Sequence, residues 1–172
     1  MLAEVIKEAR VRHDISQDVL ACRLNISQSV ISDVENGKKI LSQDLALRLP
    51  EVLNGDALVK AAIAYETKSE FFSVPVLRNV DDNPKNVLDV LVSEAAEAIS
   101  SAQDIKSLLK NKRPGKPLDD VTMAELIPLE EQIGDLFAAL KMHLITMNVN
   151  YGLDIKVVEA RVNVKLRKKG YI

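Results

Sequence analysis

Two short amphipathic segments joined by a tight turn constrain the fold of this chain more than any other feature. The first segment has an N-cap candidate in Asp14 or Ser16, and its apolar residues recur at helical spacing. The turn falls at Asn25, a residue type that enters the left-handed region at low cost. The second segment starts at the cap Ser27 and ends at about Asn36, before Gly37. We expect the inward-facing residues of the two helices to be Val19, Leu20, Ala21, Leu24, Val30, Ile31 and Val34.

Three further helices are predicted around this pair. The first runs from Leu2 to about His13, with Leu2, Val5, Ile6 and Ala9 on its apolar face. Another begins after the cap Ser42, and its apolar residues are Leu45, Leu47, Leu49, Val52 and Leu53. Pro50 interrupts this pattern, and we interpret it as the first residue of a short new helix. A last helix of this region is expected from Asp56 to about Lys68.

The register of caps, turn and apolar positions resembles the lambda-repressor-like, or XRE-type, family of helix-turn-helix domains. The matching runs are Ile15-Ser16-Gln17, Leu24-Asn25-Ile26-Ser27-Gln28-Ser29 and Ile31-Ser32-Asp33-Val34-Glu35-Asn36-Gly37-Lys38. The resemblance implies that residues 27–36 form a recognition helix, which lies in the major groove of a double-stranded DNA operator. It also implies a sequence-specific transcription regulator, a repressor of phage, prophage or bacterial type.

Side chains at the start and on the outer face of this helix are the candidates for reading bases. Gln28 can pair with adenine or reach a phosphate, and Ser29 and Ser32 can bond to base edges. The residues expected at phosphates are Gln17, Asn36, Lys38 and Lys39. Asp33 and Glu35 can accept from cytosine or repel phosphate, and the resemblance implies a structural role for Glu35.

A protein-contact role is the alternative for this domain. Acidic residues slightly outnumber basic ones between Met1 and Asn54, so no broad electrostatic footprint for nucleic acid exists. Basic side chains can still gather on one face of the fold. The candidates are Lys7, Arg10, Arg12, Lys38 and Lys39.

Composition favours an all-α protein: glycine and aromatic residues are few, and the formal net charge is −2. No stretch is long and apolar enough for a membrane span, and the first predicted helix leaves no room for a signal peptide, so we expect a cytoplasmic protein. Cys22 is the single cysteine, which excludes an internal disulfide and suits that setting. We expect Cys22 in the core, and His13 and His143 as isolated residues rather than catalytic bases.

The chain is predicted to divide into a helix-turn-helix domain (1–68), a linker (69–84) and a helical-bundle oligomerisation domain (85–172). The linker contains Phe71-Phe72, which either anchor it on a domain surface or form a dimer contact. Beyond it, long helices are expected at 85–112 and at about 121–147, with a possible kink at Pro128. A turn at 148–152 and a helix at 153–169, capped by Asp154, follow. Their wide apolar faces predict a homo-dimer or tetramer, or a surface that receives an antirepressor or another regulatory protein.

The C-terminal region also resembles the MazG-type all-α nucleoside-triphosphate pyrophosphohydrolases. Glu94 and Glu97 match a Glu-x-x-Glu pair, and Asp135 lies in a matching Gly-Asp-Leu-Phe run. Gln132 replaces an expected metal-binding Glu, for which Glu131 could substitute, and Leu166 stands where Asn is expected. The resemblance implies magnesium and nucleotide chemistry. Three interpretations stay open: charges bordering a helical interface, a degenerate site that still binds metal or nucleotide, and an active hydrolase. We expect no enzyme activity and no cofactor, with magnesium possible only if the carboxylates are functional.

Overall fold

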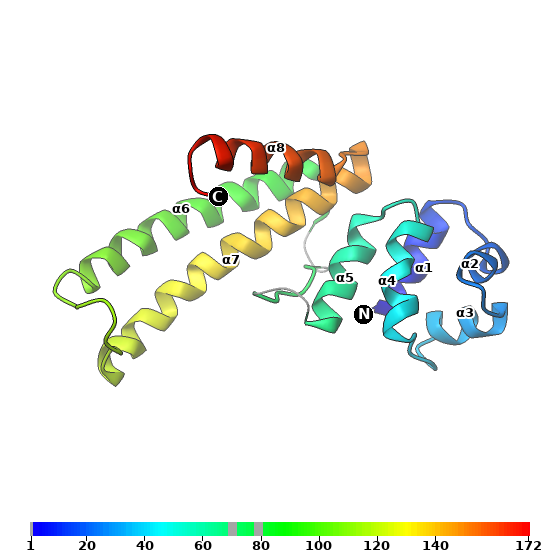
Figure 1. Ribbon diagram of the computed structural model, residues 1–172, viewed down its shortest axis with the longest axis horizontal. Coiled ribbons are helices and arrows are strands. Elements are labelled where there is room, and N and C mark those ends of the chain that lie inside the picture. Colours follow the sequence, from blue (N-terminus) through cyan, green and yellow to red (C-terminus); the bar gives the residue numbers. More distant parts are fainter. Residues whose placement is uncertain (1, 69–71, 78–80) are drawn as a thin grey trace. The chain divides into compact units, whose positions relative to one another are not determined.

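The computed structural model describes residues 2–68, 72–77 and 81–172, and within these ranges it is all-helical, as predicted (Figure 1). The helices of the described ranges are α1 (Leu2–Arg12), α2 (Gln17–Leu24), α3 (Gln28–Glu35), α4 (Gln43–Val52), α5 (Ala57–Thr67), α6 (Pro84–Leu108), α7 (Asp120–Tyr151) and α8 (Ile155–Lys168). Residues 1–76 and 147–172 form one compact unit, and residues 77–146 form a second. The domain boundaries expected from the sequence stay a prediction.

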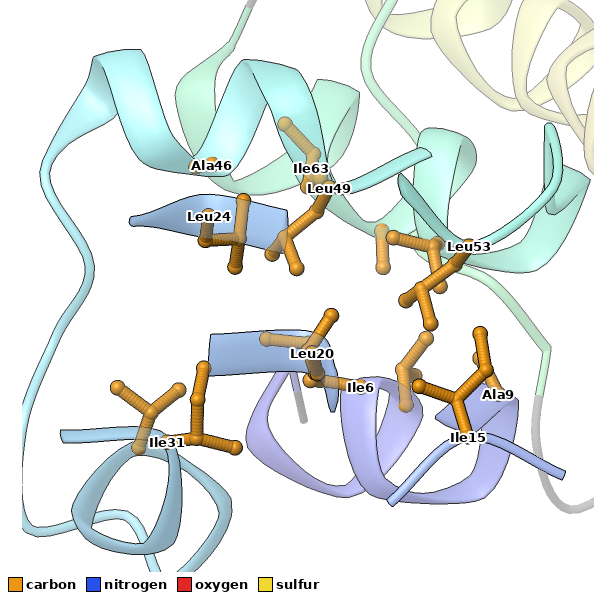
Figure 2. Packing of buried hydrophobic residues seen from close by; sticks show 14 of the residues in the cluster. Ile6, Ala9, Ile15, Leu20, Leu24, Ile31, Ala46, Leu49, Leu53 and Ile63 are labelled. Carbon is orange, nitrogen blue, oxygen red and sulfur yellow. The ribbon is translucent and has the colours of Figure 1, made fainter. Parts of the chain in front are cut away.

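Helices α1 to α5 enclose one apolar core, which Figure 2 shows from close by. The side chains that meet there come from every one of the five helices, so the helix-turn-helix pair is held by three supporting helices. The large residues with less than 2% exposure in this core are Val5, Ile6, Leu20, Leu24, Ile31, Leu49, Leu53 and Val59. Burial of each such side chain contributes about 2 kcal/mol to folding.

Local signals fix the helix ends of this bundle largely as predicted. The hydroxyl of Ser16 accepts from the backbone N–H of Val19, and that of Ser42 accepts from Leu45. Asn25 closes α2 in the left-handed conformation, with φ of 58°. Gly37 has φ of 68°, and the N–H of Lys38 reaches the carbonyl of Asp33, which is how a left-handed residue ends a helix. Ser27 precedes α3 as expected, but its side chain makes no capping hydrogen bond.

Three residues assigned to the core are exposed instead. Val19 has 42% exposure and Leu47 has 57%, and Cys22 is also exposed. In each case an adjacent residue takes the inward position, because neighbours in a helix point about 100° apart and the bundle covers only one face. Helix α2 buries Leu20, Ala21 and Leu24, while α4 buries Ala46 and Leu49.

The prediction that Pro50 starts a new helix is wrong, because Pro50 lies inside α4. Proline removes one backbone donor, which would pair with the carbonyl four residues earlier. The loss falls in the last turn of α4, and the helix continues past it through the bond from Leu53 N–H to the Leu49 carbonyl.

The second unit contains α6 and most of α7, two antiparallel helices in Figure 1. The loop between them is closed by Asp119, which accepts from Lys112 Nζ at 2.9 Å and from the N–H of Thr122 at 2.9 Å. These bonds, the Thr122 N–H first, lower the pKa of Asp119 well below its ordinary range. Pro128 lies within α7 and does not end it.

Helix α7 extends to Tyr151, so the turn predicted at 148–152 is wrong except for its last residue, Gly152, which has φ of 67°. The predicted cap Asp154 is confirmed at the start of α8. Within the expected linker, residues 72–77 and 81–83 form no helix or strand. Phe72 is half-exposed, and Phe71 lies outside the described residues.

Candidate nucleic-acid interface

The first residues of α2 and α3 lie next to each other at one end of the helix-turn-helix pair. Ser16 caps α2, so Gln17 is its first residue, and Gln28 is the first residue of α3. The side-chain nitrogen Nε2 of Gln28 donates to Oε1 of Gln17 at 2.5 Å. The two amides predicted to contact base and phosphate are therefore one hydrogen-bonded unit.

A buried ion pair between Arg10 and Glu35 holds the side chain of Gln17 in this position. Nε2 of Gln17 donates to Oε2 of Glu35 at 2.8 Å. Arg10 meets the same carboxylate with two donors, Nε to Oε1 at 2.6 Å and Nη2 to Oε2 at 3.0 Å. Its third donor, Nη1, reaches the carbonyl of Ile15 at 2.9 Å, just before α2 begins.

The charge on Glu35 is stabilised although the side chain is almost completely buried. Burial by itself raises the pKa of Glu35, but the hydrogen bonds from Arg10 and Gln17 outweigh it, and the pKa lies below its ordinary value. The hydrogen bond to Glu35 in turn raises the pKa of Arg10. The pair is thus ionised at neutral pH. The structural alternative predicted for Glu35 fits this geometry, since its carboxylate faces inward with 1% side-chain exposure.

The ion pair also sets which way round the glutamine amides lie. A carboxylate only accepts, so Glu35 draws the NH₂ group of Gln17 inward and turns its oxygen toward Gln28. That oxygen binds one N–H of Gln28. The oxygen and the second N–H of Gln28 are then left at the exposed start of α3.

The remaining predicted contact residues occupy the outer face and the exit of α3. The Ser29 hydroxyl pairs with that of Ser27 at 2.9 Å. Asn36 folds back, and its Nδ2 donates to the carbonyl of Ser32 at 2.8 Å. Asp33 is half-buried, whereas Lys38 and Lys39 are exposed beyond the helix end. The structure therefore brings Gln17 and Gln28 together and spreads the other candidates along α3 and the turn that follows it.

A second buried carboxylate was not foreseen from the sequence. Asp56 accepts from Arg12 Nη2 at 2.6 Å, lies 2.9 Å from Nε2 of His13, and accepts from the N–H of Val59 at 3.0 Å as the cap of α5. Burial raises the pKa of Asp56, but these partners outweigh it and the pKa is lowered. The expectation that His13 is isolated is wrong.

Two of the five basic residues expected to form a common face are thus engaged elsewhere. Arg10 binds Glu35, and Arg12 binds Asp56. The signal for the first pair is visible in the sequence: Arg10 follows Ile6 by four residues, and Glu35 follows Ile31 by four. Both charges therefore lie on apolar faces, where a charge requires a partner.

The carboxylates of the second unit form a looser group. Partial burial raises the pKa of Glu94, and the charges of Glu97 and Asp135 add to the shift. Within the described ranges, no group of three or more His, Cys, Asp or Glu side chains could hold a metal ion. Metal binding by Glu94, Glu97, Glu131 and Asp135 remains a prediction.

Residues 6–58 match the model of a helix-turn-helix family. The match includes the chain of hydrogen bonds that runs from Arg10 through Glu35 and Gln17 to Gln28, which we call the amide relay. It supports a DNA-binding transcription regulator. It ends within α5, so the MazG-like resemblance of the C-terminal region remains untested. No curated protein and no solved structure matches the chain. Among the described helices, none has the length and apolarity needed to cross a membrane.

Proposed function

We propose that this chain is a sequence-specific repressor of phage or prophage type, which reads its operator with α3. The observation that carries the proposal is the oriented amide relay that ends at Gln28. It leaves one acceptor and one donor, side by side, at the exposed start of a helix. A helix presented in this way fits the major groove of DNA.

The exposed edge of Gln28 matches adenine. Adenine offers an N6–H₂ donor and an N7 acceptor in the major groove, and an Asn or Gln amide pairs with both. Because Gln17 holds the amide with its oxygen free, Gln28 need not rotate before it binds. Gln17 retains a second N–H, which we expect to donate to a phosphate oxygen.

Selection of binding sites from a random duplex library tests this proposal. The selected operator is then bound to the Gln28→Ala variant and to a matched control, Gln103→Ala, which truncates an exposed amide on α6. We expect Gln28→Ala to lose about 1–3 kcal/mol of binding and its preference for adenine at one position of each half-site. A chain that selects no sequence would contradict the proposal.

The same proposal includes self-association through the second unit. Leu88, Val92 and Ile99 are exposed on α6 and, at spacings of four and seven residues, share one face of the helix. Helices with exposed apolar stripes of this kind are stabilised when a second copy covers them. A dimer also presents two recognition helices to the two halves of a palindromic operator.

A further inference from the structure

Helix α8 differs from the other helices in how little of it is covered. All of its residues are described, and none is buried. Its least exposed side chains, Ile155, Val158 and Leu166, lie along one side and are half-buried. The rest of the helix surface is open.

That open surface is strongly basic. Arg161, Lys165 and Lys168 follow each other at spacings of four and three residues, so they form a stripe on one face of α8. Arg167 and Lys169 add two more positive charges, and no acidic residue occurs between Arg161 and the last residue, Ile172. In the described ranges none of these five side chains forms an ion pair. The positive charge stands out in a chain whose formal net charge is −2.

Helix polarity explains only part of this pattern. Cations favour the C-terminal end of a helix because the carbonyl groups there carry partial negative charge, but the effect is confined to the last turn. It covers Lys165, Arg167 and Lys168. Arg161 lies a full turn before Lys165, on the same face, and extends the stripe beyond the reach of the helix end.

We propose that the α8 stripe, defined by Arg161, Lys165 and Lys168, binds the phosphate backbone of duplex DNA without regard to sequence. This inference rests on the proposed function and adds a second DNA contact to it. The helix-turn-helix region needs such a contact, because acidic residues outnumber basic ones there and Arg10 and Arg12 are engaged with buried carboxylates. Phosphate contacts supply nearly all of the affinity of proteins for DNA when binding is not sequence-specific.

The structure ties α8 to the DNA-reading unit. Residues 147–172 belong to the same compact unit as α1 to α5. Asn148 makes the link: its Oδ1 accepts from the N–H of Ala57 at 3.2 Å, and its Nδ2 donates to the carbonyl of Leu153 at 2.8 Å, just before α8. Helix α8 therefore belongs to the compact unit that also contains α3.

A duplex fits the stripe better than an anionic membrane surface does. Helices that lie in membrane interfaces bury Trp, Phe and Leu side chains beside their basic face. The apolar residues of α8 that flank the stripe are Val157 and Val164, and α8 contains no aromatic residue. The one aromatic residue that follows α8 is Tyr171, which is exposed and lies against Lys169, with 5.8 Å between Nζ and the ring centroid. The stripe on α8 itself thus has no aromatic anchor beside it.

The test is the salt dependence of binding by the full chain to a 30-base-pair duplex of arbitrary sequence. The Arg161→Gln/Lys165→Gln/Lys168→Gln variant keeps good helix formers and removes three charges. We expect the slope of log affinity against log salt to become shallower by about 2.7, since each neutralised phosphate contributes about 0.9. The control is Lys85→Gln/Lys106→Gln/Lys110→Gln, which removes the same number of charges outside α8. It should change the slope by less than about 0.9, the contribution of one phosphate contact.

The possible results separate this inference from the proposed function. A wild-type chain that binds no DNA contradicts both. Binding with a selected sequence, but with equal slopes for the wild-type chain and the α8 variant, overturns the stripe and leaves the reading by α3 intact. Circular dichroism of the variant is the control that tests whether its helix content is unchanged. Vesicles of anionic phospholipid serve as the second probe. If the α8 variant binds vesicles less than the wild-type chain does, while the salt dependence of its DNA binding is unchanged, the inference is also overturned.

Discussion

Nε2 of Gln28 lies 2.5 Å from Oε1 of Gln17, so the first residue of α3 is oriented by the first residue of α2. Gln17 is in turn oriented by Glu35, and Glu35 by Arg10. Fold stability and the proposed base reading by Gln28 therefore depend on the same buried charge. Changes at Arg10, which lies on α1 and not on α3, are expected to affect both.

The Arg10→Met variant should be less stable by about 3 kcal/mol, because it leaves the buried Glu35 carboxylate without a counter-charge. Urea unfolding at neutral pH measures the loss. The double variant Arg10→Met/Glu35→Met removes both charges and should regain most of the stability while still failing to orient Gln17. A double variant as unstable as the sum of the two single changes would contradict the pairing.

Acid should weaken the helix-turn-helix unit through two carboxylates. The pKa values of Glu35 and Asp56 lie below their ordinary values of 4.5 and 3.8. Each therefore stabilises the folded state above those values and loses that contribution as the pH falls through the lowered folded pKa. We expect the unfolding free energy to be flat from pH 7 to about 5 and to fall below that.

The matched variant for this pH profile is Glu35→Gln. It should be less stable than the wild-type chain at pH 7, and the difference should shrink on acidification. A difference that stays constant down to the acid transition would show that the Glu35 charge is not linked to folding. The measurement is a series of urea titrations at fixed pH.

Asp56 has a double role, which the pair Asp56→Asn and Asp56→Ala can separate. Both variants lose the charge that meets Arg12, but asparagine still caps α5. We expect Asp56→Ala to cost about 1 kcal/mol more than Asp56→Asn. The control is Asp154→Ala, which removes the cap of α8. Because α8 buries no residue, loss of this cap should lower the helix content with little effect on the free energy of global unfolding. Equal stability of the two Asp56 variants would contradict the capping role.

Self-association should depend on the apolar stripe of α6. Sedimentation of the full chain is expected to show a dimer or larger species, and the Leu88→Ser/Val92→Ser/Ile99→Ser variant a monomer. The matched control is Val121→Ser, an exposed apolar residue at the start of α7. A monomeric wild-type chain would contradict self-association and leave the stripe open to a partner such as an antirepressor.

The sequence alone was sufficient to predict the structural features that depend on residues close together in the chain. Ser16, Asn25 and Gly37 act within one or two turns, so the ends of α2 and α3 could be predicted from residue type and spacing. The apolar spacing likewise identified Ile31 and Val34 as core residues. The prediction of Gln17 and Gln28 as contact residues also rests on amide side chains at the N-termini of helices, together with the family resemblance.

The partners in the two buried ion pairs could not be predicted in the same way, since each pair joins residues that are far apart in the chain. Arg10 and Glu35 are separated by 25 positions, and Arg12 and Asp56 by 44. Which basic residue meets which carboxylate depends on how α1, α3 and α5 pack. Side chains at the boundary of a face, such as Val19 and Leu47, were misplaced because period alone does not say how wide the covered face is.

Docking of the outer face of α3 in the major groove is tested most directly at Ser32, which is half-buried on that face. In the proposed complex, Ser32→Glu would bring a negative charge close to phosphates and base edges, and Ser32 is not one of the buried residues of α3. With Ser100→Glu on the exposed side of α6 as the matched control, the affinity for the selected operator is measured by fluorescence anisotropy. We predict that Ser32→Glu abolishes binding while its melting temperature stays close to that of the wild-type chain. Retained affinity in a folded Ser32→Glu variant would contradict it.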